Sequence, residues 1–207
     1  SAAVRLQENG YFLAPHRSFA YLCFTNTDHG PAEARQPPAI VLRNHSPKKH
    51  IPMAIEKTLV LLKPCTLQRA LAGEIISIFE KKGLQICGMK MMQLDDAILS
   101  EHYAHLSAKP FFQRVKDSMM TAPVVALCLA GVDAVAAVRA LAGPTNGRLA
   151  APGTIRGNYC MSFQENIVHA SDSPETAAVE LARFFRPEEI FSYRPATFDY
   201  LYANDEY

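Results

Sequence analysis

The sequence contains no tryptophan, and its 207 residues carry a formal net charge of only +1 at pH 7. No stretch reaches the roughly 20 uninterrupted apolar residues that a membrane-spanning helix requires. The small net charge gives no long-range attraction toward nucleic acid or an anionic membrane surface. We therefore expect no membrane association and do not favour a nucleic-acid partner, and any recognition of phosphate must depend on a few locally placed Lys and Arg side chains.

The glycine-rich motifs of common nucleotide-binding folds are also missing. The chain has neither a Walker A motif nor a G-x-G-x-x-G motif, which argues against P-loop and Rossmann sites. Its five cysteines form no C-x-x-C pair, show no Cys/His metal-ligand spacing and are odd in number. A disulfide framework or a zinc site is therefore not expected, and the cysteine usage fits a reducing, cytoplasmic environment.

Composition changes near residue 52. Residues 1–52 show no sustained helical or strand periodicity, and they end in a stretch rich in Pro, Arg and His. Four of the seven histidines lie in this part without the spacing of metal ligands. We expect residues 1–52 to be a disordered leader or an artefact of an upstream start codon, and residues 53–207 to form the folded domain.

After residue 53 the apolar residues recur with strand and helix periods. Strands are predicted at residues 58–62, 84–94 and 123–129, with a fourth strand ending at residue 169. Helices are predicted at residues 67–82, 95–105, 109–120, 132–141 and 174–185, with a long loop at 143–157. This order predicts an α+β fold of the ferredoxin-like type, with a four-stranded antiparallel sheet and helices over one face.

The most informative stretch is 166–173, Asn-Ile-Val-His-Ala-Ser-Asp-Ser. Two β-branched residues before the histidine predict the end of a buried strand. The Ser-Asp-Ser-Pro that follows predicts a helix start, with Asp172 or Ser173 as N-cap. His169 is therefore expected between a rigid strand and the positive end of a helix, where an imidazole can act as a nucleophile toward a phosphoryl group.

Three cations and one carboxylate are placed to serve this histidine. Lys63 follows the first strand, Arg139 lies near the end of a helix, and Arg156 ends the long loop. Phosphoryl transfer needs positive charge around the phosphate oxygens, so we expect these side chains to form a phosphate clamp. Glu180, on the last predicted helix, can hold one imidazole nitrogen so that the other attacks.

Several ordered stretches match one known family: Lys63-Pro64, Lys109-Pro110-Phe111-Phe112, Gly143-Pro144-Thr145-Asn146, Pro152-Gly153-Thr154-Ile155-Arg156-Gly157 and Asn166 through Ser173. On these motifs, residues 55–207 resemble the nucleoside diphosphate kinase family. The resemblance implies a ping-pong kinase that maintains nucleotide pools. It would move the γ-phosphate of a nucleoside triphosphate onto His169, as a phosphohistidine, and then onto a nucleoside diphosphate.

The resemblance also implies roles for individual residues. In the implied nucleotide site, the base rests against the ring of Phe112. The sugar is contacted by Lys63 and Asn166, and the phosphates by Arg139, Thr145 and Arg156. In the implied catalytic set, His169 is the nucleophile and Glu180 orients its imidazole. Tyr103 lies nearby, Ser171 supplies a supporting hydroxyl, and Lys63 lies near the transferred phosphate. Mg²⁺ is implied as a cofactor held mainly through the nucleotide phosphates, so no dedicated metal ligands are expected.

Five positions depart from the family pattern. Cys65 and Asn158 stand where the family commonly has Asp, Thr66 and Ala170 where it has Gly, and Gly147 where it has Pro. None of them removes a residue with a direct chemical role. We expect the two missing carboxylates to weaken the support of the phosphate-binding loop, and so to alter stability more than activity.

The resemblance further implies a homo-oligomer. The tyrosine-rich tail 191–207 is expected to pack against a neighbouring subunit, which favours a hexamer over a tetramer. Two alternatives stay open: a catalytically silent scaffold of the same fold, and a nucleic-acid-binding module. The retained His169 and its cations argue against the scaffold, and the strands lack the aromatic pattern of RNA-binding sheets.

Overall fold

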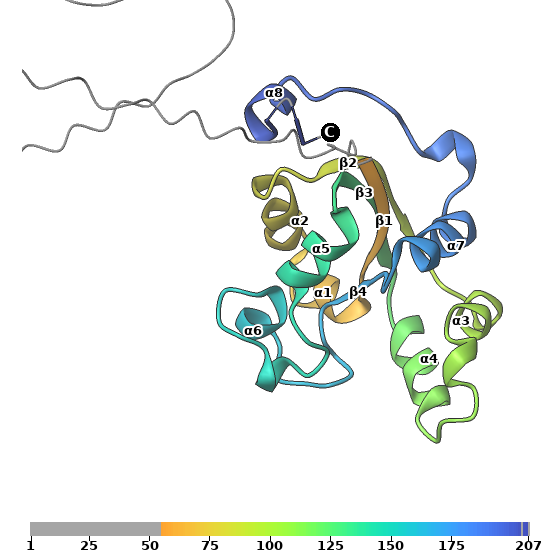
Figure 1. Cartoon of the computed structure of the whole chain (residues 1–207). Coiled ribbons are helices and arrows are strands. Elements are labelled where there is room, and N and C mark those ends of the chain that lie inside the picture. The colour runs from red at the N-terminus through yellow and green to blue at the C-terminus, as the bar shows by residue number, and fades with distance from the viewer. Residues whose placement is uncertain (1–54, 204, 207) are drawn as a thin grey trace, which may run out of the picture. The chain divides into compact units, whose positions relative to one another are not determined.

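Four strands form one sheet in the spatial order β2-β3-β1-β4 (Figure 1). The structure is a computed structural model that describes residues 55–203 and 205–206. The strands are β1 (Ile55–Leu62), β2 (Gln85–Met92), β3 (Val124–Val132) and β4 (Val168–Ala170). The predicted leader, residues 1–52, lies outside the described residues, so the proposed division of the chain stays a prediction.

Every pairing in the sheet is antiparallel. β1 pairs with β3 along its whole length, from Ile55 opposite Val132 to Leu62 opposite Val125. The short β4 pairs with the end of β1, where His169 lies opposite Leu61. β1 and β2 are separated by β3, so the chain makes a split βαβ crossover. The predicted ferredoxin-like α+β fold is thus confirmed.

Helices cover both faces of this sheet (Figure 1). They are α1 (Pro64–Gln68), α2 (Ala72–Lys81), α3 (Asp96–His102), α4 (Phe112–Met120), α5 (Ala134–Ala142), α6 (Ile155–Tyr159), α7 (Pro174–Phe184) and α8 (Phe198–Leu201). Short 3₁₀ turns occur at η1 (Ala104–Leu106), η2 (Gly147–Leu149) and η3 (Pro187–Glu189). Within residues 55–203, none of the helices has the length and apolar character needed to cross a membrane.

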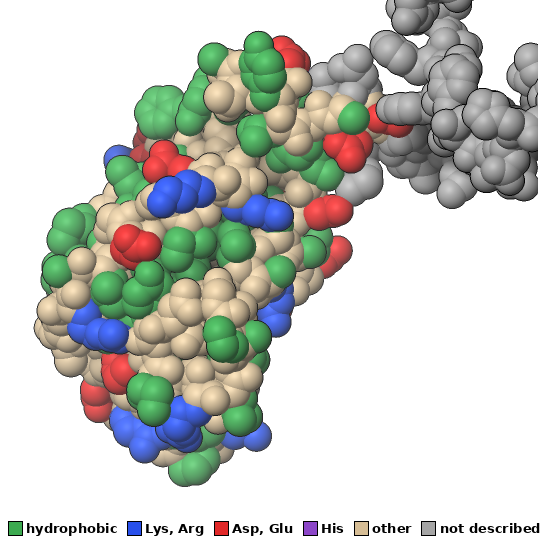
Figure 2. Space-filling view, turned by 90° about the vertical axis from the view of Figure 1, so that its left-hand side faces the viewer, with side chains coloured by type: hydrophobic (Ala, Val, Ile, Leu, Met, Phe, Trp, Pro, Cys, Tyr) green, Lys and Arg blue, Asp and Glu red, His purple; other side chains and the backbone are tan. Residues whose placement is uncertain are grey.

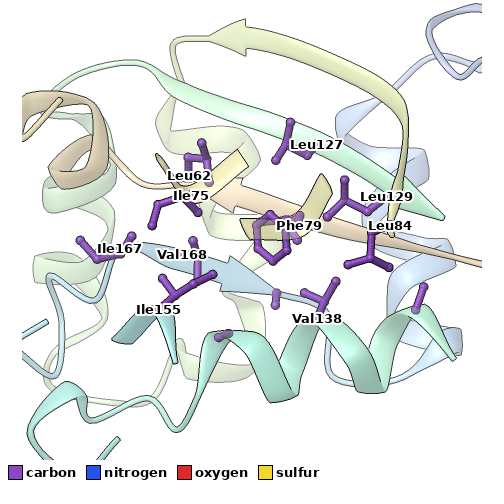
Figure 3. Packing of buried hydrophobic residues seen from close by; sticks show 14 of the residues in the cluster. Leu62, Ile75, Phe79, Leu84, Leu127, Leu129, Val138, Ile155, Ile167 and Val168 are labelled. Atoms are coloured by element: carbon purple, nitrogen blue, oxygen red, sulfur yellow. The ribbon is translucent and has the colours of Figure 1, made fainter. Parts of the chain in front are cut away.

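The prediction that helices cover only one face is wrong. Along β1, Val60 and Leu62 pack with α2 and α5, in a cluster that surrounds Phe79 (Figure 3). The alternate residues Leu59 and Leu61 pack on the other face with side chains from α3, α4 and α7. Successive strand residues point to opposite faces, so a continuous apolar run marks a strand that is buried on both.

Two predicted elements are divided in the structure. The helix expected at 67–82 is broken between α1 and α2, where Ala70 takes a positive φ of 54°. The loop expected at 143–157 contains η2 and the start of α6. Of the two N-caps predicted for the last helix, Ser173 is the one observed, because its side chain accepts from the backbone N–H of Thr176, and Asp95 caps α3 in the same way by accepting from that of Ile98.

The C-terminal segment after α7 returns to the edge strand β2. The backbone N–H of Phe191 donates to the carbonyl of Cys87 at 2.7 Å, and the hydroxyl of Tyr193 donates to the carbonyl of Ile86 at 3.0 Å. The tail is therefore held by its own chain. The rings of Phe191 and Tyr193 remain exposed, so their expected contact with another subunit stays a prediction.

We expect Phe79→Ala to lower the free energy of unfolding by about 3–5 kcal/mol, since it removes a fully buried ring from the centre of one core cluster. Chemical denaturation followed by circular dichroism measures this loss. Val179→Ala on the exposed face of α7 is the matched control, with a change below about 0.5 kcal/mol. Equal effects of the two substitutions would contradict the described packing.

Candidate active site

The backbone just before β4 has a conformation unusual for its residue type. Ile167 has a φ of 71°, in the left-handed region that a β-branched residue rarely occupies. Its carbonyl is fixed from two sides, by the backbone N–H of Lys63 at 2.9 Å and by the hydroxyl of Thr66. These bonds hold a strained turn two residues before His169, and such strain is typical of functional sites.

His169 is oriented by a chain of hydrogen bonds. Its Nε2 lies 3.0 Å from Oε1 of Glu180 on α7, and the other carboxylate oxygen accepts from the hydroxyl of Ser171 at 2.6 Å. The Ser171 oxygen also accepts from the backbone N–H of Leu59 on β1 at 3.3 Å. Burial opposes ionisation of Glu180, but the hydrogen bonds from His169 and Ser171 outweigh it and lower the pKa of the carboxyl. The structure therefore joins these three predicted residues and leaves Nδ1 of His169 as the nitrogen not bound by Glu180.

A second histidine, which the sequence analysis did not select, packs against the first. The His102 ring lies edge-on to His169 with the ring centroids 4.5 Å apart, while Tyr103 lies farther away, at 6.4 Å. Burial, followed by the charge of His169, lowers the pKa of His102 to about 3, so this imidazole is neutral at physiological pH. Burial also raises the pKa of Tyr103. In the sequence, the position of His102 directly before the predicted site residue Tyr103 was the one feature that could have indicated it.

Arg156 is buried and bound to the main chain at the bottom of the site. Its three guanidinium nitrogens donate to the carbonyls of Gly143 at 2.6 Å, Val168 at 2.7 Å and Asn166 at 3.3 Å. Gly143 has a φ of 76°, and a Cβ at this position would lie 2.6 Å from Oγ1 of Thr154. Arg156 therefore shapes the loop as well as supplying positive charge near His169.

Arg139 is held differently, because it is exposed and paired with the carboxylate of Asp172. An exposed ion pair is weak, so this guanidinium can exchange its partner for an anionic ligand at little cost. Lys63 lies at the other side of the site, where its ammonium donates to the carbonyl of Gln164 at 3.2 Å. The predicted cations thus come from three elements, with Lys63 directly after β1, Arg139 on α5 and Arg156 on α6.

Thr145 and Asn166, the two remaining polar residues predicted to bind the nucleotide, are joined by a hydrogen bond, and the predicted base-stacking residue Phe112 lies on α4. The amide nitrogen of Asn166 donates to the carbonyls of Phe163 at 2.8 Å and Thr145 at 3.2 Å. The amide oxygen of Asn166 is buried and has no hydrogen-bond partner among the described residues. Phe112 begins α4 and is half-buried.

Asn158 and Glu165 supply the loop support that was expected to be lost. The amide oxygen of Asn158 accepts from the backbone N–H of Gly153 at 2.9 Å, so Asn braces the loop without a charge. Near Cys65, the carboxylate of Glu165 accepts from the hydroxyl of Ser118 and contributes to the charge environment of Lys63. A carboxylate is therefore present close to Cys65, contributed by a residue 100 positions later.

Close packing explains why Gly147 stands where the family commonly has Pro. A Cβ on Gly147 would lie 2.3 Å from the Cβ of Cys160, a distance that no side chain can accept without moving the backbone. The approach of Cys160 therefore requires glycine here, and the family's usual proline does not fit.

A family model for nucleoside diphosphate kinase matches residues 56–190, which is well over half of the chain. The chain belongs to the nucleoside diphosphate kinase family. It is therefore an enzyme that transfers phosphate between nucleotides, and the clustered His169, Glu180 and Arg156 are consistent with that activity.

Individual relatives agree with the family match. The nucleoside diphosphate kinase of Parabacteroides distasonis is 67% identical over 153 residues, which are 74% of this chain and 100% of the relative. That of Pyrococcus furiosus is 47% identical over 151 residues, 72% of this chain and 93% of the relative. The solved structure of the Halobacterium salinarum nucleoside diphosphate kinase in complex with CDP superimposes with a TM-score of 0.71 at 37% identity, covering 72% of this chain and 100% of that chain.

Within this nucleoside diphosphate kinase site, Lys63 has a shifted protonation equilibrium. Burial, together with the nearby charge of Arg156, lowers the pKa of its ammonium from 10.5 to about 8. The Lys63 ammonium is therefore half protonated at about pH 8. Its positive charge is present well below that pH and is lost as the pH rises through it. The positive charge of this part of the site is therefore smaller in alkaline solution.

We expect kcat/KM for a nucleoside diphosphate to fall above about pH 8, as Lys63 loses its proton. In Lys63→Arg this alkaline limb should move to higher pH, because a guanidinium keeps its charge there. Steady-state assays across the pH range measure the limb, with the exposed Lys82→Arg as the control that leaves it in place. If kcat/KM of Lys63→Arg fell at the same pH as that of the unchanged enzyme, the titrating group would be another residue.

Proposed function

We propose that Nδ1 of His169 carries the phosphate between the two nucleotides. In the first half-reaction Nδ1 attacks the γ-phosphorus of the bound triphosphate. The new N–P bond forms as the bond between that phosphorus and the bridging β–γ oxygen breaks, and the nucleoside diphosphate leaves with the bond's electrons. In the second half-reaction a terminal β-phosphate oxygen of another diphosphate attacks the phosphorus of the phosphohistidine, the N–P bond breaks with its electrons returning to Nδ1, and a new triphosphate and the neutral imidazole result. The single observation that carries this proposal is the 3.0 Å contact between Nε2 and Glu180, which engages Nε2 and leaves Nδ1 as the nitrogen that can attack.

Glu180 has an electrostatic role in this step. The imidazole becomes positively charged when Nδ1 bonds to phosphorus while Nε2 keeps its proton. A carboxylate at 3.0 Å stabilises that charge, and the bond from Ser171 keeps Glu180 in its ionised form. The neutral His102 beside it adds packing without a competing positive charge.

The cations are proposed to divide the phosphate groups among them. Arg156 stays on its backbone carbonyls and presents fixed charge, while Arg139 releases Asp172 to bind phosphate oxygens. Lys63 would contact the transferred phosphate and the sugar, and the hydroxyl of Thr145 would add a donor. Positive charge that is already in place stabilises the transition state without reorganisation.

The nucleoside is proposed to bind between Asn166 and Phe112. The unpartnered buried oxygen of Asn166 is an acceptor that a sugar hydroxyl would satisfy, which removes the cost of leaving it unpaired. The ring of Phe112 would stack on the base. Stacking involves no base edge, so it suits an enzyme that accepts many nucleotides.

Mg²⁺ is proposed to enter with the nucleotide as part of the substrate. Among the described residues, one group has metal-ligand spacing, His102, His169 and Glu180, and it contains the nucleophile itself. A metal ion at this group would occupy the imidazole that must react. The donors therefore fit an ion held through phosphate oxygens and water, where it neutralises charge on the phosphates.

Free nucleotides are favoured over nucleic acid as the partner. On the face shown in Figure 2, Lys and Arg side chains are interspersed with acidic and apolar ones. A polynucleotide is bound through a continuous basic surface, whereas a triphosphate needs only a few converging cations. The arrangement around His169 supplies the latter.

We further propose a homo-oligomer, with a hexamer favoured over a tetramer, working in the cytoplasm. The exposed rings of Phe191 and Tyr193, held along β2 by their backbone and hydroxyl bonds, support the assembly. The four cysteines in the described part of the chain are free thiols, which supports a reducing compartment.

We expect His169→Ala to reduce phosphate transfer from ATP to GDP by at least ~10³-fold, because it removes the covalent nucleophile. After incubation with γ-labelled ATP, the unchanged enzyme should carry acid-labile, base-stable label and the variant none. The matched control is His105→Ala on η1, an exposed histidine whose loss should leave label and turnover intact. Label retained in His169→Ala, or absent from the unchanged enzyme, would refute the proposal.

A further inference from the structure

Glu165 is a half-buried carboxylate that the reaction described above does not use. It lies in the segment between α6 and β4. Its Oε1 accepts from the hydroxyl of Ser118 on α4 at 2.5 Å and from the side-chain amide of Gln164 at 3.1 Å. Burial opposes ionisation of Glu165, but these hydrogen bonds outweigh it and lower the pKa of the carboxyl. The group is therefore an anion at neutral pH.

The segment that carries Glu165 also holds Lys63. The ammonium of Lys63 donates to the main-chain carbonyl of Gln164, the residue before Glu165, at 3.2 Å. Four groups act on this ammonium through their charge, namely the guanidinium of Arg156, the thiols of Cys65 and Cys160, and the carboxylate of Glu165. Burial raises the pKa of both thiols, so they are uncharged at neutral pH. Of these four groups, Glu165 is thus the one anion.

The charge of Lys63 is opposed by its surroundings. Burial disfavours the ammonium, and so does Arg156, whose guanidinium is bound to three main-chain carbonyls and stays in place. A nearby anion acts in the opposite direction, because it stabilises an ammonium and has no such effect on a neutral amine. Without the carboxylate of Glu165, Lys63 would lose its proton closer to neutral pH.

We propose that Glu165 is a positioning residue for Lys63, keeping the ammonium charged and in place for the phosphate. The family commonly has Asp where this chain has Cys65, and the thiol of Cys65 interacts with the carboxylate of Glu165. Glu165 therefore supplies, from a distant part of the chain, a negative charge that position 65 lacks. This inference rests on the proposed contact between Lys63 and the transferred phosphate.

The proposal makes the effect of Glu165 dependent on pH. The hydrogen bonds of Glu165 join it to Ser118 and Gln164, whereas the imidazole of His169 is bound by Glu180. Loss of the negative charge should therefore leave catalysis intact where Lys63 is still protonated and reduce it where the weakened ammonium has lost its proton. A structural defect would instead reduce activity at every pH.

The test follows kcat/KM for GDP, with ATP as donor, across the pH range in the full chain. We expect Glu165→Gln to move the alkaline limb down by about 0.5–1 pH unit and to keep kcat/KM at about pH 6.5 within about twofold. The matched control is Glu80→Gln, which removes an exposed carboxylate from α2 and should leave the limb in place. Ser118→Ala removes a hydrogen bond but keeps the charge, so its limb should not move either.

A second variant restores the charge from another position. Cys65→Asp places a carboxylate next to Glu165, so by itself it should move the alkaline limb to higher pH. Combined with Glu165→Gln, it should return the limb toward that of the unchanged enzyme. Should Glu165→Gln fail to fold, as judged by circular dichroism, Cys65→Asp alone decides the question, and an unmoved limb would overturn the inference.

Lys63→Arg separates this inference from the proposed function on which it rests. If Lys63→Arg moves the limb and Glu165→Gln does not, the role of Glu165 is wrong and that of Lys63 stands. If Lys63→Arg leaves the limb in place, Lys63 is not the titrating group and both roles fall. An equal loss of kcat/KM at every pH in Glu165→Gln, or a shift of the same size in Ser118→Ala, would show that Glu165 acts through structure and not through its charge.

Discussion

The buried carboxylate of Glu180 connects the parts of the fold that the reaction needs. From α7 it binds the imidazole of His169 on β4 with one oxygen and the hydroxyl of Ser171 with the other. Ser171 is hydrogen-bonded to the backbone of Leu59, so the charge is linked to the central strand β1. A carboxylate is stable in such an interior only because its hydrogen bonds are satisfied. The nucleophile is consequently as rigid as the sheet that carries it.

The cations around this centre fall into two physical kinds. Arg156 is buried and bound to three carbonyls, so it contributes fixed charge and also holds the loop that begins at Gly143. Arg139 is exposed and paired with Asp172, so it can change partners when a nucleotide arrives. Lys63, whose pKa is about 8, lies between these extremes and links the charge of the site to the pH of the solution. The proposed phosphate site would thus combine a buried, fixed guanidinium with an exposed one.

Helices α3 and α4 pack against each other, and α3 reaches the histidine on β4. α3 ends at His102, whose ring packs against His169, and α4 begins at Phe112. The buried Lys116 joins the helices through Asp96.

The sequence by itself determined the strand that leads to His169, the Ser173 cap after it and the family motifs around it, because these depend on local spacing and on residue type. It also indicated Glu180, which lies on the last predicted helix, and Arg156, which ends the predicted loop. Only the tertiary structure decided that helices cover both faces of the sheet, because an apolar run signals burial without saying what covers each side. It likewise decided the pairing of Lys116 with Asp96. Such contacts join residues far apart in the chain, and no local pattern encodes which distant side chain will satisfy a buried charge.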